Sequence, residues 1–252
     1  MPCAAGKQPA YATGRDPMDG DHLLRPGGLE LTARAVDFAG LGAGAAVLDL
    51  GCGSGDSVRY LRTLGIDAIG IDCAPGIEGH ADSSPASWVG VVASAGHLPV
   101  PECSLDGVLA ECSVSLIEDQ DAAFGECARV LKDRGRLMIT DLYARQPHAI
   151  AQVRAFKHSC VAGMIVRAEL VQHLADSEFT IDLWEDHSPA LRASAARFIF
   201  QHGSLEGLWN CDAETASTED ISGAMRAVRA GYFLLIATRN PRPKHLKGTD
   251  HE

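Results

Sequence analysis

The run of residues 47–55 constrains the fold of this chain most strongly. It reads VLDLGCGSG, which is a short apolar segment, an acid and three glycines at alternate positions. Glycine has no Cβ, so a turn of this kind lets a ligand approach the backbone closely. A helix beginning after the turn would present free N–H groups and the positive end of its dipole to an anionic group. The run therefore predicts a strand, a ligand-binding turn and a helix in that order.

Apolar segments alternate with amphipathic segments between about residues 30 and 145. Because several of the apolar segments are hydrophobic on both faces and helices separate them, the pattern predicts a parallel sheet that is covered on both sides. The expected fold class is therefore α/β, with a doubly wound, mostly parallel sheet. The expected strands are 46–50, 68–71, 88–92, 105–110 and 137–140, and the expected helices are 29–39, 57–64 and 122–131, with a loop over 74–87.

The pattern changes after residue 145. Further helices are expected at 147–161, 168–174, 191–200 and from Ser217 onward, and further strands at 179–184 and 232–238. We expect a single domain over residues 21–239, in which residues 146–230 form helical decoration on the acceptor side of the sheet. Residues 1–20 and 240–252 are rich in proline, glycine or basic residues, and we expect both to be flexible tails.

Composition narrows the class of partner. The chain has 252 residues with 22 Lys and Arg against 33 Asp and Glu, a formal net charge of −11. An acidic surface disfavours nucleic acids and anionic membranes, which leaves a small molecule as the expected partner. The first twenty residues lack the apolar core of a signal peptide, and the apolar run at 232–237 is too short to span a bilayer. The eight cysteines form no C-x-x-C pair, so we expect reduced thiols, no metal site and a cytoplasmic location.

The turn indicates which nucleotide could bind. A dinucleotide-binding turn has the spacing G-x-G-x-x-G, whereas this one is G-x-G-x-G followed by Asp56, whose charge would repel a pyrophosphate. A nicotinamide oxidoreductase is therefore a weaker alternative. A nucleoside without phosphate fits better, and S-adenosylmethionine is one. Asp49 would face its cationic amino-acid part, and Asp72, at the end of the next strand, would bind the ribose hydroxyls.

These residues resemble motifs I and II of the class I S-adenosylmethionine-dependent methyltransferases. Residues 93–99 are similar to the family's loop after the third strand, 105–109 to its fourth strand and 129–137 to the turn before its fifth strand. The resemblance covers about residues 25–145, and 232–238 matches the last, antiparallel strand. It implies a Rossmann-like, seven-stranded sheet, S-adenosylmethionine as cofactor and transfer of a methyl group to a small molecule.

The resemblance also implies roles for individual residues. Ser94 occupies the position of an acid that binds the adenine amino group, so backbone near Ala95 and Gly96 would make those contacts. Candidate catalytic residues are His97 and Asp141 as general bases and Tyr143 as a wall of the acceptor pocket, while Arg25 would clamp a carboxylate or the acceptor. The expected cofactor-binding residues are Asp49, Gly51, Cys52, Gly53, Gly55, Asp72, Cys73, Ser94, Ala95, Gly96 and Glu111.

Two further alternatives stay open. Residues 111–116 and 158–163 resemble segments of arsenite methyltransferases, in which the cysteine matching Cys160 holds trivalent arsenic. Soft thiolates suit such a metalloid, but the second arsenic-binding cysteine has no counterpart near 197–202. One alternative is therefore a methyltransferase that uses Cys160 and acts on a metalloid such as arsenite or selenium, or on a thiol. Cys160 would otherwise be a packed thiol on the apolar face of its helix. The last alternative is a protein that binds S-adenosylmethionine without catalysis.

Overall fold

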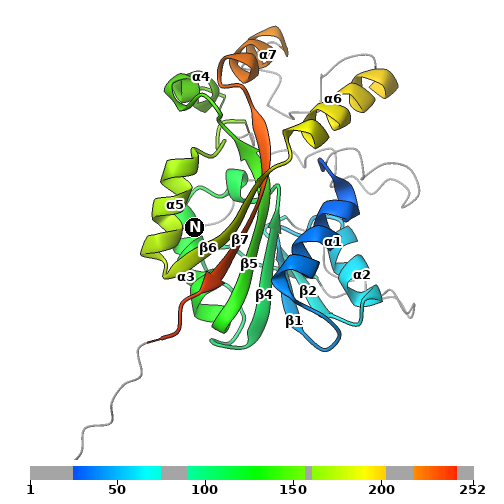
Figure 1. Ribbon diagram of the computed structural model, residues 1–252, viewed down its shortest axis with the longest axis vertical. Coiled ribbons are helices and arrows are strands. Elements are labelled where there is room, and N and C mark those ends of the chain that lie inside the picture. Colours follow the sequence, from blue (N-terminus) through cyan, green and yellow to red (C-terminus); the bar gives the residue numbers. More distant parts are fainter. Residues whose placement is uncertain (1–24, 75–89, 157–160, 203–217, 243–252) are drawn as a thin grey trace, which may run out of the picture.

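The computed structural model describes residues 25–74, 90–156, 161–202 and 218–242 (Figure 1). Helices and strands alternate along the chain, as the sequence pattern predicts. The elements in order are α1 (Gly28–Ala39), β1 (Ala46–Leu50), α2 (Asp56–Thr63), β2 (Asp67–Asp72), β3 (Gly90–Val92), β4 (Leu105–Glu111), the 3-10 turn η3 (Val114–Leu116), α3 (Gln120–Val130), β5 (Leu131–Tyr143), the 3-10 turn η4 (Pro147–Ala149), α4 (Ile150–Arg154), α5 (Arg167–Asp176), β6 (Phe179–Asp186), α6 (Ser188–His202), α7 (Thr218–Ala227) and β7 (Gly231–Arg239).

The seven strands form one sheet in the order β3-β2-β1-β4-β5-β7-β6. The pairs β2–β3, β1–β2, β1–β4 and β4–β5 are parallel, and β7 runs antiparallel to both β5 and β6. The predicted fold class is therefore confirmed. Because β1 has β2 on one side and β4 on the other, the strand order reverses at β1, and ligands of open α/β sheets bind outside the carboxyl ends of strands at such a reversal.

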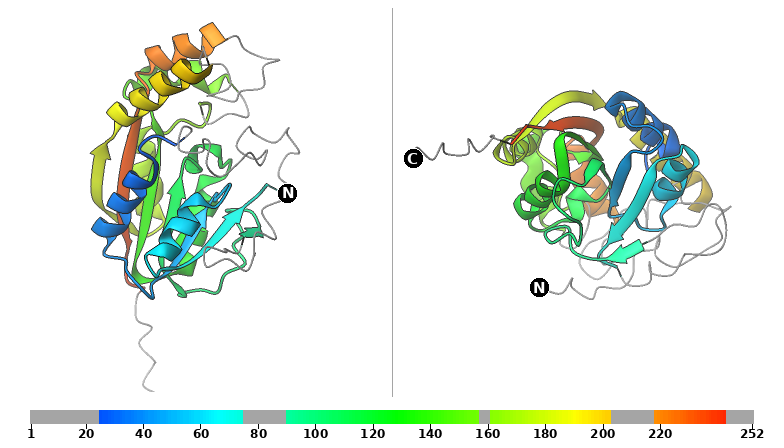
Figure 2. Two further views of the ribbon diagram at one scale, coloured as in Figure 1. Left: turned by 90° about the vertical axis from the view of Figure 1, so that its right-hand side faces the viewer. Right: turned by 90° about the horizontal axis from the view of Figure 1, so that it is seen from below.

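Helices cover both faces of the sheet, and each face has its own apolar core (Figure 2). Helices α1, α2 and α7 pack on one face, against alternate residues of the strands such as Val47, Leu109 and Leu234. Helices α3 and α5 pack on the other face, against Leu48, Val108 and Leu235. This alternation is what a doubly covered sheet requires of buried strands. Figure 1 shows α4, α6 and α7 gathered beyond one end of the long strands β5 and β7.

The helix predicted over 147–161 is wrong in its length. Pro147 does begin a helical turn, but α4 ends at Arg154, and Val161–Gly163 lie in a turn. The chain then returns to the sheet, where the Ala144 N–H donates to the Ile165 carbonyl at 2.8 Å. A Cβ at Gly163 would lie 1.7 Å from the Ser115 carbonyl oxygen. Gly163 therefore packs directly against η3, where no side chain would fit.

The predicted strand 137–140 is longer than expected, because β5 begins directly at the end of α3. Its register with β4 shifts between Leu105 and Gly107. At the other end of the chain, the Arg242 guanidinium donates to the carbonyls of Ala128 and Arg129, at 3.1 and 2.9 Å. The predicted tail from residue 240 is thus anchored up to Arg242, and its remainder, like residues 1–20, lies outside the described residues. None of the helices within the described ranges is both long and apolar enough to cross a bilayer.

Candidate functional site

The glycine turn joins β1 to α2 and folds back onto the end of β2. The N–H groups of Gly51 and Cys52 both donate to the Ile71 carbonyl, at 2.7 and 3.1 Å. Gly51 has φ +78°, and a Cβ there would lie 2.4 Å from the Cβ of Ser113. The Ser113 hydroxyl donates to the Leu50 carbonyl at 2.7 Å, which fixes the segment after β4 against the turn. Glycine at position 51 is therefore required by both backbone angle and space.

Asp72 lies beside the turn, as its place at the end of β2 predicts. One carboxylate oxygen accepts a hydrogen bond from the Gly53 N–H at 3.0 Å, and the other accepts one from the Ala74 N–H at 2.9 Å. The carboxylate is thus held at the carboxyl edge of the sheet, next to the position where the strand order reverses. This location is suited to binding the hydroxyl groups of a sugar.

Asp49 is the most unusual acid of the site. Its residue is only 3% exposed, and among the described residues none donates a hydrogen bond to its carboxylate. Burial, together with the nearby carboxylate of Glu111, raises the pKa of Asp49 to about 8 against the opposing effect of the Arg25 guanidinium. A buried carboxylate without donors is costly, so a cationic or hydrogen-bonding ligand would find a strong partner here.

Glu111, at the end of β4, accepts three hydrogen bonds, whereas Asp49 accepts none from the described residues. One of its oxygens accepts from Arg25 Nη1 at 2.6 Å and from Ser57 Oγ at 2.5 Å, and the other accepts from Thr32 Oγ1 at 2.9 Å. The network connects the segment before α1, α1 itself, α2 and β4. The buried Nε of Arg25 has no hydrogen-bond partner in the part of the chain that the structure describes. The site therefore holds two buried carboxylates and one guanidinium.

The sequence interpretation placed Arg25 and Glu111 near the ligand but missed Thr32 and Ser57. Both lie on the buried faces of amphipathic helices, where a hydroxyl must find a partner. A hydroxyl on the buried face of a helix was therefore the sequence signal for these two residues, but the sequence does not show that both donate to Glu111.

Asp141 has a structural role in this geometry. Its carboxylate accepts hydrogen bonds from the N–H and the hydroxyl of Ser115, at 2.9 and 2.8 Å, and from the Leu142 N–H at 2.7 Å. Asp141 is fully buried, and burial raises its pKa to about 6 against the effect of these hydrogen bonds. The carboxylate therefore holds η3 onto the end of β5, which weakens its interpretation as a general base.

Tyr143 packs into the core on the α3–α5 face of the sheet. Its ring meets those of Trp184 and Phe233 edge-on, with centroids 5.5 and 5.9 Å apart. Burial raises the pKa of Tyr143, as does the neighbouring carboxylate of Asp186, to which its hydroxyl is hydrogen-bonded. These contacts account for Tyr143 without an acceptor molecule.

The loop after β3 is more open. His97 and Ser94 are exposed, Ala95 and Gly96 are half-buried, and the His97 N–H donates to the Ser94 carbonyl at 3.0 Å. Of the candidate bases, His97 alone has an exposed side chain.

The cysteines near the turn differ in their surroundings. Cys52 is buried, and burial together with Asp49 and Asp72 raises the pKa of its thiol well above the usual range, which argues against a nucleophile. Cys73 is exposed, and Cys160 lies outside the described residues. Within the described ranges, no three His, Cys, Asp or Glu side chains gather as a metal site would require.

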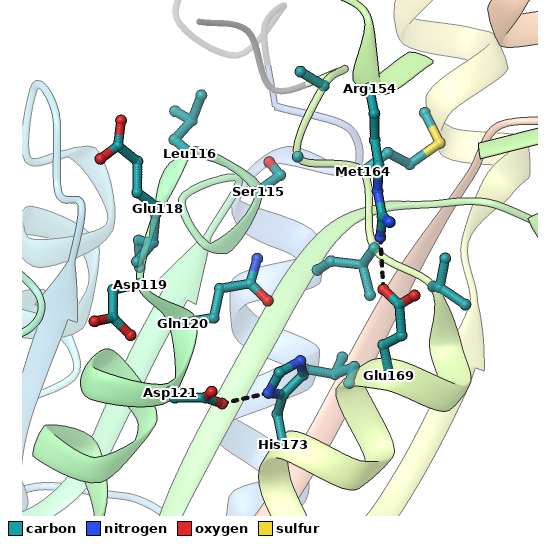
Figure 3. Close-up of a pocket in the computed structure, with 16 residues that line it drawn as sticks. Ser115, Leu116, Glu118, Asp119, Gln120, Asp121, Arg154, Met164, Glu169 and His173 are labelled. Atoms are coloured by element: carbon teal, nitrogen blue, oxygen red, sulfur yellow. Dashed lines mark hydrogen bonds and ion pairs between the residues drawn. The ribbon is translucent and has the colours of Figure 1, made fainter. Parts of the chain in front are cut away.

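A separate cleft of about 820 Å³ lies between η3, the start of α3 and helix α5. Figure 3 shows an ion pair across it between Arg154 and Glu169, at 2.7 Å, and a hydrogen bond between His173 and Asp121. These four side chains therefore have partners within the cleft itself.

Comparison with known proteins supports the sequence resemblance. Residues 48–139 match the family model of a methyltransferase domain. The chain is 33% identical over 175 residues to the O-methyltransferase resE of Aspergillus sclerotiorum, which covers 66% of each chain. It is 32% identical over 118 residues to an arsenite methyltransferase of Halobacterium salinarum, covering 44% of this chain and 30% of that protein. The [4+2]-cyclase SpnF shares the fold, with a TM-score of 0.61, 22% identity and coverage of 84% and 81%.

Most of these matches cover only part of the related protein. The chain spans 27%, 30% and 41% of the lengths of the first three curated relatives that it matches. The family model matches the segment from β1 to β5, which contains the glycine turn, Asp49, Asp72 and Glu111. The sheet order, the glycine turn and the matched domain together identify this chain as a member of the class I S-adenosylmethionine-dependent methyltransferase family.

Proposed function

We propose that this protein transfers a methyl group from S-adenosylmethionine to a small molecule. One observation carries the proposal: Asp49 and Asp72 lie at the carboxyl ends of two neighbouring parallel strands, on either side of the glycine turn. Asp49 in addition lacks any hydrogen-bond donor among the described residues. An adenosyl sulfonium ligand with an amino-acid tail matches this combination of a sugar-binding acid and a buried acid beside a glycine turn.

The residues of the site divide the binding of that cofactor among them. Asp72 would accept hydrogen bonds from the ribose hydroxyls, and Asp49 would face the positive charge of the amino-acid tail. Arg25, whose Nε has no hydrogen-bond partner among the described residues, would hold the tail carboxylate. Backbone near Ala95 and Gly96 and the side chains of Ser94 and Cys73 would lie toward the adenine.

S-adenosylmethionine supplies a methyl group that is already activated by its positively charged sulfur. The protein then has to align donor and acceptor and to exclude water, and alignment alone can contribute several kcal/mol. A base is needed only for an acceptor that arrives protonated, and exposed His97 is the candidate best placed for that role. We further propose that residues 146–230 cover the acceptor and that the protein acts in the cytoplasm.

Titration calorimetry with S-adenosylhomocysteine tests the cofactor site. We expect Asp72→Ala to weaken binding about 100-fold, since it removes both the ribose acceptor and the support of the turn. Asp67→Ala is the matched control, because Asp67 is an exposed acid at the other end of the same strand. Absence of binding to the wild-type protein at millimolar ligand, or equal affinities of the two variants, would contradict the proposal.

Turnover of S-adenosylmethionine with a panel of acceptors tests the chemistry. The panel should include alcohols, phenols, amines, thiols, arsenite and selenite. Arsenite belongs in it because of Cys160 and because one relative is an arsenite methyltransferase. A solved neighbour of the same fold is a cyclase, so methyl transfer has to be measured rather than inferred from the fold. Tight binding without turnover on any acceptor would favour the non-catalytic alternative.

A further inference from the structure

We propose that binding of the amino-acid tail of the cofactor releases a proton from Asp49, so that cofactor affinity depends on pH. This inference rests on the proposed function for the identity of the ligand. It concerns the protonation state of the site, which neither the fold nor the family match determines.

The geometry leaves the buried cluster one positive charge short. Asp49 and Glu111 are two buried carboxylates, and Arg25 is their one cationic neighbour among the described residues. The Arg25 guanidinium bonds directly to Glu111, at 2.6 Å. Glu111 also receives hydrogen bonds from Thr32 and Ser57. Asp49 is therefore the carboxyl group without a cationic partner, and none of the described residues donates a hydrogen bond to it.

The groups that face Asp49 come from every neighbouring element. They are Glu111 from β4, Arg25 from the segment before α1, Asp72 from β2 and Asp56 from the start of α2. Three of these four are acids, and each of them disfavours a negative charge on Asp49. With burial as the largest cause, the pKa of Asp49 rises to about 8, so the carboxyl is mostly protonated at pH 7.

A bound ammonium group would reverse this balance. A positive charge next to Asp49 favours its carboxylate, and the proton leaves for solvent. Binding then competes with protonation, so apparent affinity rises with pH until Asp49 is ionised in the free protein. With a pKa of about 8, we expect affinity to increase about ninefold between pH 6 and pH 7, where the ammonium group of the ligand keeps its proton.

Calorimetry counts the proton directly. S-adenosylhomocysteine is titrated into the wild-type protein at pH 7 in buffers of different ionisation enthalpy, and the slope of the observed enthalpy gives the protons released. We expect about 0.9 proton per ligand at pH 7 and about 1 at pH 6, where the ammonium group of the ligand is fully protonated. Adenosine lacks the ammonium group and should release none. Zero release with S-adenosylhomocysteine, or equal release with adenosine, would overturn the inference.

Two variants locate the source of the proton. Asp49→Asn keeps the shape of the side chain but cannot titrate, so it should bind without proton release and with a flat pH profile. Glu111→Gln removes the neighbouring negative charge and leaves Arg25 beside Asp49, so the count should fall well below the wild-type value. If either variant released as many protons per bound ligand as the wild-type protein, the inference would be overturned. Binding without proton release contradicts this inference alone, whereas no binding at all contradicts the proposed function.

Discussion

Two buried aspartates at the same edge of the sheet have opposite surroundings. Asp49 lies near the end of β1, just before the glycine turn, and Asp141 lies near the end of β5, where η3 contacts that strand. Asp49 is 3% exposed and Asp141 is 0% exposed. Asp141 accepts three hydrogen bonds, whereas Asp49 accepts none from the described residues. A buried carboxylate with its donors in place stabilises a fold, and one without them costs stability. The contrast indicates that Asp141 serves the structure, and it supports the proposal that Asp49 serves a ligand.

The comparison also shows that position at a strand end does not by itself identify a functional acid. Both residues lie where open α/β sheets bind ligands, and both have a raised pKa, to about 8 for Asp49 and about 6 for Asp141. The hydrogen-bond partners separate them. Proteins tolerate unsatisfied groups mainly where function needs them, so the two acids should respond differently to substitution.

The largest effect is expected for Asp141→Ala. It leaves the N–H groups of Ser115 and Leu142 buried without an acceptor, so we expect a loss of about 3–4 kcal/mol in the free energy of unfolding, measured by urea denaturation. Asp141→Asn keeps one acceptor oxygen and should lose less. Affinity of the remaining folded protein for S-adenosylhomocysteine should be unchanged. A loss below about 1 kcal/mol, or a selective loss of binding, would remove the contrast with Asp49.

Asp49→Asn should gain stability relative to the wild-type protein as pH rises, in contrast to the loss of stability expected for Asp141→Ala. The pKa of Asp49 is raised on folding, so the native state holds a proton that the unfolded chain has lost, and stability falls as pH rises from about 4 to about 8. Asparagine does not titrate. We therefore expect the stability of the variant relative to the wild-type protein to increase by about 2–3 kcal/mol between pH 5 and pH 7.

Urea denaturation at both pH values measures this difference, with Asp67→Asn as an exposed control that should show almost none. A relative stability that stays constant or falls with pH would mean that Asp49 is ionised in the free protein, in contrast to the cluster geometry.

The sheet and half of the site could be predicted from the sequence, because their signals are local. Apolar runs marked the strands, and the alternate glycines with Asp49 placed the turn at the reversal of strand order. Asp72 followed from its position at the end of the next strand, and its carboxylate does contact the turn through Gly53. Parallel strands bring their carboxyl ends to one edge, so spacing along the chain sufficed for these residues.

The hydrogen-bond partners could not be predicted in this way. Thr32 and Glu111 are 79 positions apart, and Ser115 and Asp141 are 26 apart. Periodicity shows which face of an element is buried, but it does not show which side chains meet there. For the same reason the sequence suggested Asp141 as a base. The packing of Gly163 against Ser115 was missed in the same way, because the two residues belong to segments that are distant in the chain.

The smallest effect is expected for Tyr143→Phe, which extends the comparison to a third residue at this edge. The Tyr143 hydroxyl is hydrogen-bonded to Asp186 and Ser188, and its ring packs between aromatic neighbours that phenylalanine would keep. We expect a loss of about 1 kcal/mol in the free energy of unfolding and an unchanged kcat for methyl transfer to the acceptor found by turnover. If Tyr143 instead contacted the acceptor, KM or kcat would change at least tenfold while stability stayed nearly constant. The ratio of the two effects therefore decides whether Tyr143 belongs with Asp141, as part of the fold, or with Asp49, as part of the site.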